Sequence, residues 1–232
     1  MKTLTVMSRK GGAGKTTVAV NLTLAARAAG IRAVLADADS LRSASEVLKG
    51  RDDAPGLLFE TSAAKLFTLT DACRRSGVDL LVIDTPAAPE ADVAECAKVA
   101  DLCIAVARPT YLDLAATVQS VAVIQRLGRD GLIVLNQAPP ARGGLEPPCV
   151  LKAFEALRFA NLPVAPTALR SRIVYQSAFA QGRSVLEAEG GGAAAREVQA
   201  LFGQAWRRLN GRPAAAASSA NDDLIGVGQR IA

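Results

Sequence analysis

The chain has 232 residues, half of them hydrophobic and only 4% aromatic, with a net charge of +5 and no histidine. This composition is typical of a globular α/β protein whose core consists of Ala, Val, Leu and Ile, and the missing histidine excludes the usual Ser-His and Cys-His nucleophile mechanisms. Because the sequence shows neither a secretory signal nor an apolar run of membrane-spanning length, we expect a cytoplasmic protein with reduced cysteines.

Apolar segments with strand and helix patterns alternate along the chain. Strands are predicted at 3–8, 33–36, 80–83, 102–106 and 132–135, and helices at 16–29, 64–75, 91–100, 112–127 and 193–209. This alternation indicates one α/β domain, over residues 1–212, with a mostly parallel twisted sheet covered by helices on both faces. Residues 137–148 are predicted to be a loop, and the Ala/Ser-rich tail at 213–232 is predicted to be disordered.

A glycine-rich loop with two lysines follows the first predicted strand and precedes the first predicted helix. Residues 11–16 read Gly-Gly-Ala-Gly-Lys-Thr, which is typical of a phosphate-binding P-loop. In such a loop, backbone N–H groups surround the phosphates, a lysine neutralises the β/γ oxygens and a threonine hydroxyl ligates magnesium. We therefore predict an ATP and Mg²⁺ site at Lys10, Gly11, Gly12, Ala13, Gly14, Lys15, Thr16 and Thr17.

Acidic residues end two of the predicted strands, where the carboxyl edge of a parallel sheet binds ligands. The buried strand at 80–83 runs into Asp84, and the strand at 33–36 runs into Asp37-Ala38-Asp39. A hydrophobic strand that ends in aspartate is the pattern of a Walker B site, whose carboxylate holds Mg²⁺, often through water. We expect Asp84, together with Thr16, to hold the metal.

The loop resembles that of the deviant-Walker ATPases of the ParA/MinD family, which carries a second lysine at the position of Lys10. The resemblance implies that ATP closes two copies face to face, with Lys10 of each copy reaching its partner's phosphates and acting in catalysis with Lys15. It also implies that Asp39 orients the attacking water and lies at the metal site, and that Asn136 contacts adenine. The implied activity is slow, partner-stimulated hydrolysis of ATP to ADP and phosphate.

The segment 172–187 is similar to the carboxyl-terminal signature of small ParA proteins that partition plasmids and chromosomes, so the resemblance runs from Lys2 to about Leu209. Because the P-loop begins close to Met1, we expect the compact type without an amino-terminal DNA-binding domain. For such proteins the family implies ATP-dependent, sequence-independent DNA binding, which suits the nine basic and four acidic residues between 151 and 212. The predicted DNA contacts are Arg172, Arg183, Arg207 and Arg208.

The leading hypothesis is a nucleoid-associated ParA-type ATPase that segregates or positions a plasmid, chromosome region or other cargo with a ParB-like stimulating partner. A MinD-like membrane-positioning ATPase is one alternative, and it would need an amphipathic basic helix near the carboxyl end. Residues 221–232 contain two aspartates and one arginine, so they favour no membrane contact. A metabolic P-loop relative is the other alternative, although we find no substrate motif for it.

Overall fold

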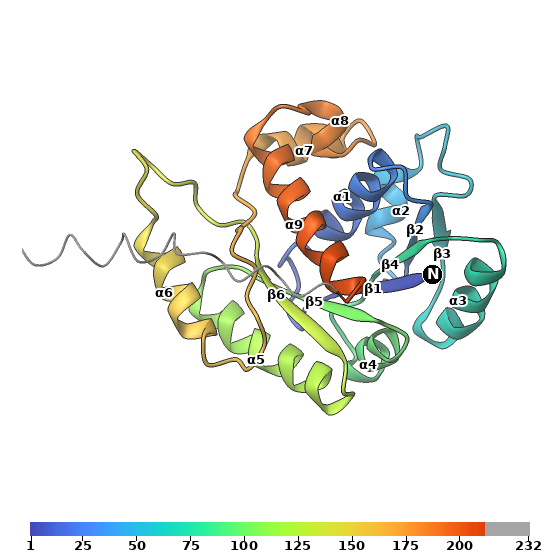
Figure 1. The fold of residues 1–232 in the computed structure, drawn as a ribbon, viewed down its shortest axis with the longest axis horizontal. Helices are drawn as coiled ribbons and strands as arrows, with labels where there is room; N and C mark the ends of the chain where they lie inside the picture. Colours follow the sequence, from blue (N-terminus) through green and yellow to red (C-terminus); the bar gives the residue numbers. More distant parts are fainter. Residues whose placement is uncertain (212–232) are drawn as a thin grey trace, which may run out of the picture.

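A parallel sheet of six strands runs through the middle of the molecule (Figure 1). The computed structural model describes residues 1–211. The strands are β1 (Lys2–Met7), β2 (Ala33–Asp37), β3 (Leu58–Glu60), β4 (Leu80–Asp84), β5 (Leu102–Ala107) and β6 (Asp130–Leu135). Their order in the sheet is β3-β2-β4-β1-β5-β6, and every neighbouring pair is parallel.

All strands except β3 are buried on both faces, because successive side chains of a strand point to opposite sides of the sheet. In β5, Leu102, Ile104 and Val106 join the core on one face. The intervening Cys103 and Ala105 join the core on the other face. Such burial on both faces explains why the strands read as continuous apolar runs rather than as alternating ones.

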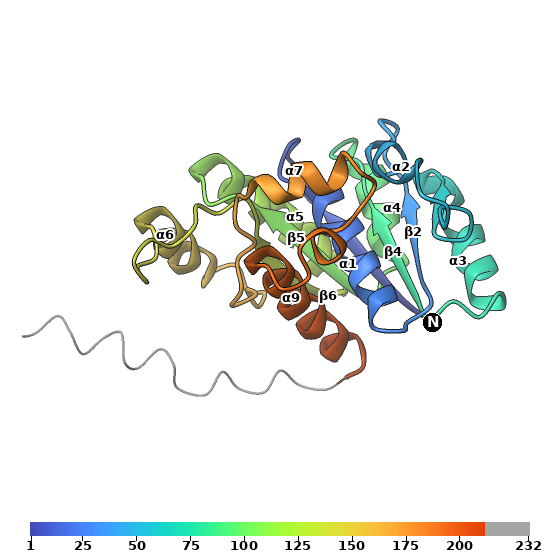
Figure 2. The same cartoon turned by 90° about the horizontal axis from the view of Figure 1, so that it is seen from above.

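Helices cover both faces of the sheet. They are α1 (Lys15–Ala28), α2 (Ser43–Leu48), α3 (Leu66–Arg75), α4 (Glu90–Lys98), α5 (Tyr111–Arg126), α6 (Pro148–Leu157), α7 (Ile173–Phe179), α8 (Val185–Ala188) and α9 (Ala193–Leu209), with a 3₁₀ turn, η1 (Ala63–Lys65). Residues of α1, α2, α7, α8 and α9 pack on one face, and residues of α3, α4, α5 and α6 pack on the other. Helices α1 and α9 lie side by side (Figures 1 and 2).

The predicted strands and long helices are confirmed, with bounds that differ by at most two residues. The helix expected over 64–75 begins as the 3₁₀ turn and becomes α-helical only at Leu66. The loop expected over 137–148 ends one residue early, because Pro148 is the first residue of α6. The sequence prediction missed β3, α2, α6, α7 and α8. The tail predicted at 213–232 lies outside the described residues, and no helix within residues 1–211 is long and apolar enough to cross a membrane.

Candidate nucleotide-binding site

All six strands end at the same edge of the sheet, and the loops that follow β1, β2, β4 and β6 meet there. The loop after β1 is the predicted P-loop. Its Gly12 and Gly14 adopt positive φ angles of +74° and +91°, which side chains strongly disfavour. Gly14 is also the N-cap residue of α1, and the following Lys15 is almost fully buried. The amino terminus of α1 therefore points its free N–H groups toward this loop, as a phosphate site requires.

Two side chains that follow β6 fasten the P-loop to the sheet. Asn136 donates from Nδ2 to the carbonyl of Ala13 at 2.8 Å, and Gln137 donates from Nε2 to the carbonyl of Gly12 at 3.0 Å. A Cβ atom at Gly14 would lie 2.1 Å from Asn136 Nδ2. Asn136 thus braces the loop, while its contact with adenine stays a prediction. Gln137 was missed by the sequence prediction, because nothing in its local sequence indicates this long-range contact.

Thr16 and Asp84 meet at the predicted metal position. Thr16 Oγ1 donates to Asp84 Oδ2 at 2.7 Å. Asp84 is fully buried, and its Oδ1 has no hydrogen-bond partner among residues 1–211. Burial raises the pKa of Asp84 to about 7, against the lowering effect of the Thr16 hydroxyl. A hydroxyl beside an unpaired carboxylate oxygen is a donor set that fits Mg²⁺, which prefers oxygen ligands.

The two aspartates at the end of β2 have different surroundings. Asp37 is fully buried and accepts hydrogen bonds from the backbone N–H and the hydroxyl of Ser45 at 2.9 and 3.0 Å. It therefore fixes the start of α2. Asp39 is partly exposed, and its Oδ1 accepts from the N–H of Leu41 at 3.0 Å. Asp39 follows β2, whose last residue Asp37 pairs with Asp84 of β4, so Asp39 lies at the same edge of the sheet as the metal position; its catalytic role stays a prediction.

Lys10 lies next to the first turn of α5. Its Nζ is 3.5 Å from Asp113 Oδ2, and its side chain is 32% exposed whereas that of Asp113 is 2% exposed. Arg108 binds the same carboxylate through Nε at 2.9 Å and Nη2 at 3.2 Å. Burial acts to raise the pKa of Asp113, but hydrogen bonds from Arg108 and Thr110 and the positive charges of Arg108 and Lys10 outweigh it and lower that pKa. The carboxylate therefore stays ionised at neutral pH.

The four predicted DNA-contacting arginines do not gather at one place. Arg172 pairs with Glu197 of α9 at 2.6 Å, while Arg208 pairs with Asp130 near the other end of that helix. Eleven residues separate Glu197 from Arg208, which corresponds to about 16 Å along a helix. Arg207 is exposed.

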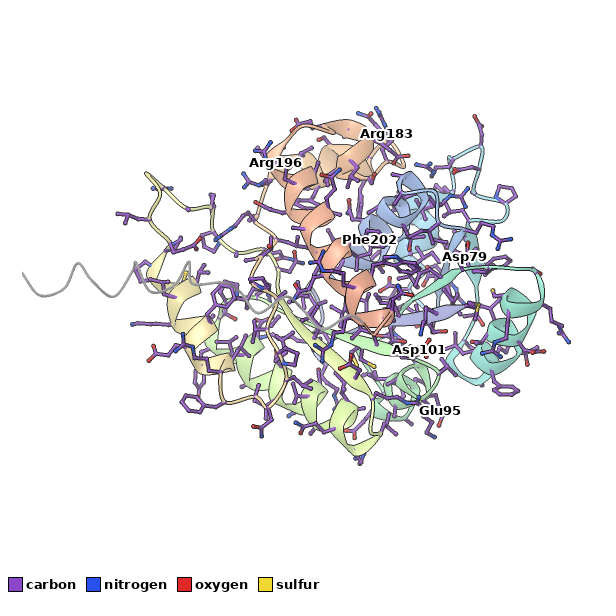
Figure 3. All side chains as sticks on the ribbon, viewed as in Figure 1. Asp79, Glu95, Asp101, Arg183, Arg196 and Phe202 are labelled. Carbon is purple, nitrogen blue, oxygen red and sulfur yellow. The ribbon has the colours of Figure 1, made fainter. Side chains whose placement is uncertain are left out.

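Arg183 is exposed as well and lies at the end of the molecule formed by α7 and α8 (Figure 3). Arg196, a basic residue that was not among the predicted contacts, is also exposed there (Figure 3). The arginine side chains at this end donate to backbone carbonyls, Arg183 to Glu187 and Arg196 to Gly191.

Residues 4–138 match the family model described as the CobQ/CobB/MinD/ParA nucleotide binding domain. Two relatives are named Maintenance of carboxysome distribution protein A. The one from Gloeobacter kilaueensis is 32% identical over 205 residues, which cover 87% of this chain and 90% of the relative. The one from Halothiobacillus neapolitanus is 27% identical over 216 residues, which cover 87% of this chain and 95% of the relative.

Solved structures share the fold. MinD from Pyrococcus horikoshii, in complex with Mg-ADP, has a TM-score of 0.74 at 18% identity and covers 91% of this chain and 98% of its own. An ATP complex of a Cyanothece McdA variant has a TM-score of 0.69 at 18% identity and covers 91% of this chain and 96% of its own. With the family model matching more than half of the chain, these comparisons show that the protein belongs to the ParA/MinD family of P-loop ATPases.

Proposed function

We propose that this chain is a ParA-type positioning ATPase. ATP closes two copies face to face, the dimer binds DNA without sequence preference, and a partner protein stimulates hydrolysis that returns the dimer to monomers. The position of Lys10 carries the proposal. Lys15 is buried at the start of α1, where it neutralises the phosphates of its own protomer, whereas Lys10 lies partly exposed at the edge of the loop, open to a second copy.

Each residue of the site has a role in this reaction. The P-loop backbone and Lys15 hold the β and γ phosphates. When bound, Mg²⁺ neutralises charge on the phosphate oxygens, and Thr16 and Asp84 would hold it. Asp39 positions a water in line with the γ-phosphorus. The water oxygen bonds to phosphorus as the bond to the bridging oxygen breaks, and the products are ADP and phosphate.

The exposed arginines support binding to the DNA backbone. Arg183 and Arg207 are exposed among the predicted contacts, and Arg196 adds a third exposed charge near Arg183. Arg172 and Arg208 are engaged by carboxylates, so they reach phosphates only by exchanging these partners. Contacts to phosphate give affinity without sequence readout and weaken with salt. A protein that binds in this way would be cytoplasmic and associated with the nucleoid.

The names of the two relatives refer to carboxysome distribution, and they support a cargo of the carboxysome kind. In this proposal a ParB-like partner bound to the cargo stimulates hydrolysis. A plasmid or a chromosome region would use the same cycle, because the cargo contacts the partner and not the ATP site.

Sedimentation and gel shift with non-specific DNA test the proposal. The native protein should dimerise and shift DNA with ATP but not with ADP, and more strongly at low salt. Lys15→Ala should remain monomeric, whereas Asp39→Ala should dimerise and persist on DNA because it does not hydrolyse ATP. Lys10→Ala should dimerise less than the native protein does with ATP. Lys98→Ala is its matched control, because it removes another lysine that pairs with a carboxylate, Glu95, far from the loop.

Two results would contradict the proposal. One is DNA binding that does not respond to the nucleotide. The other is equal dimerisation of the Lys10→Ala and Lys98→Ala proteins, since only the first of these lysines lies beside the P-loop.

A further inference from the structure

Helix α5 carries a buried polar stripe that faces the start of the P-loop. The stripe consists of Asp113, Thr117 and Ser120, whose spacing of four and three residues places them on one side of the helix. All three are at most 3% exposed. Burying a polar group costs free energy unless the group has a hydrogen-bond partner. Ser120 Oγ accepts from the backbone N–H of Arg9 at 3.3 Å, so the stripe contacts the residue just before Lys10.

Asp113 has more cations than its single charge requires. Arg108 alone binds both carboxylate oxygens, at 2.9 and 3.2 Å, in the bidentate geometry that arginine favours. The amino terminus of α5 adds positive potential of its own. Lys10 is the second cation, at the longer distance of 3.5 Å. If Lys10 moved away, Arg108 would still bind both carboxylate oxygens of Asp113. Lys10 is therefore the cation of this cluster that can move to another anion.

We propose that Asp113 is a positioning residue that holds Lys10 in a resting place within its own protomer, and that dimerisation with ATP transfers Lys10 to the partner's phosphates. This inference rests on the proposed function, because it assumes that Lys10 acts across a dimer. The transfer exchanges one ion pair for another, and the triphosphate carries more negative charge than a carboxylate already neutralised by Arg108. Lys10 must leave Asp113 before it can cross, so the cluster sets the ATP level at which dimers form.

The resting pair is tested first without nucleotide, by the rate at which an acetylating reagent modifies Lys10, measured by mass spectrometry. In Asp113→Asn, Lys10 should react about two- to fivefold faster than in the native protein, the usual range for losing one partly exposed ion pair. In Arg108→Gln, Lys10 should react more slowly than in the native protein, because Lys10 is then the one cation that remains beside Asp113 in the cluster. Local damage to α5 would make Lys10 react faster in both variants. A faster reaction in Asp113→Asn together with a slower reaction in Arg108→Gln therefore indicates that Asp113 positions Lys10, and not that α5 is damaged.

Two controls accompany this measurement. Ser177→Ala replaces an exposed serine of α7, outside the stripe, and should leave the reactivity of Lys10 unchanged. Lys98, which pairs with Glu95 on α4, should react equally in all the variants. An equal rate for Lys10 in the native and Asp113→Asn proteins, or faster reaction in Arg108→Gln, would overturn the resting pair. If Asp113→Asn does not fold, the rate for Lys10 in Arg108→Gln still tests the resting pair, because a rate slower than in the native protein is expected only if Asp113 holds Lys10.

The transfer is tested by titrating ATP and following dimerisation by light scattering. Asp113→Asn should reach half-maximal dimer at about two- to fivefold less ATP than the native protein, because Lys10 no longer has to leave a carboxylate. An equal or higher ATP requirement would overturn the role of Asp113. A native protein that stays monomeric at saturating ATP would instead refute the dimer itself, and the acetylation result distinguishes that failure from a failure of the resting pair.

Discussion

Gly14→Ala is a sharp test of how the P-loop is built, because it adds only one methyl group. Gly14 has a φ angle of +91°, and its missing side chain leaves room for the amide of Asn136. That amide is buried and bonds to the carbonyl of Ala13. The substitution therefore perturbs both the backbone of the loop and its brace.

Both effects have a magnitude that follows from the structure. A residue with a side chain at this φ costs roughly 1–2 kcal/mol. The new Cβ would lie 2.1 Å from Asn136 Nδ2, so the amide must leave the Ala13 carbonyl. The buried carbonyl of Ala13, left without this partner, costs about 1–3 kcal/mol. We expect the free energy of unfolding to fall by about 2–5 kcal/mol, a large part of the 5–15 kcal/mol of a typical domain, and ATP binding to be lost.

Urea denaturation and titration with a fluorescent ATP analogue measure these changes. Gly11→Ala is the matched control in the nucleotide-free monomer, because nothing in the described chain lies within 4 Å of a Cβ at Gly11 and its φ is not positive. In an Asn136→Ala background, Gly14→Ala should destabilise by only the backbone part, about 1–2 kcal/mol. If Gly14→Ala and Gly11→Ala have the same stability without nucleotide, the bracing role of Asn136 is wrong.

Three further predictions concern the helices and the metal position. Ser184→Ala removes the capping box of α8 and should lower the free energy of unfolding by about 0.5–2 kcal/mol in urea, whereas the exposed Ser177→Ala should change it by less than about 0.5 kcal/mol. Arg51→Ala removes the hydrogen bond to the Gly182 carbonyl that joins the segment after α2 to the segment before α8; it should destabilise by about 1–3 kcal/mol, and cleavage by protease before α8 should become faster. Nucleotide-free protein should lose stability relative to Asp84→Asn as the pH rises from about 4 to about 7, because the folded-state pKa of Asp84 is raised to about 7 and folding in this range must take up a proton at the buried carboxyl; parallel stability curves for the two proteins would contradict this.

The sheet and the long helices could be predicted because their signals are local. Buried strands appear as apolar runs, and each long helix extends over enough turns to show its period. Strand β3 has three residues and α8 has four, too few for any period to show. Helix α6 was missed for another reason, since Pro147 and Pro148 indicate a loop although proline is favoured in the first turn of a helix.

The part of the candidate site that could be predicted consists of residues that were expected to bind the same ligand. Thr16 and Asp84 both follow strands of a P-loop fold, so their meeting could be expected from the sequence. The contact of Lys10 with Asp113 joins residues 103 positions apart, and the brace from Asn136 to the loop joins residues 123 positions apart. No spacing rule links such pairs, because helix packing brings them together.

The sequence was a similarly incomplete guide to the surroundings of the predicted DNA contacts. Arg172 and Arg208 were selected from the family resemblance together with the basic charge of their region, and neither could show that Glu197 and Asp130 lie beside them.

The two outer strands of the sheet are poor templates for another strand. Strand β3 is short and ends in Glu60, a charge that lies 3.7 Å from Arg42. Beyond β6, the segment around Val164 bonds to Ile133 and contains Pro163 and Pro166, which have no N–H group to donate. Charged, short or proline-bearing borders of this kind discourage uncontrolled strand addition. Self-association is thereby steered away from open-ended aggregates, which suits the proposed dimer, since that dimer would form through the loop-bearing edge and not through an outer strand.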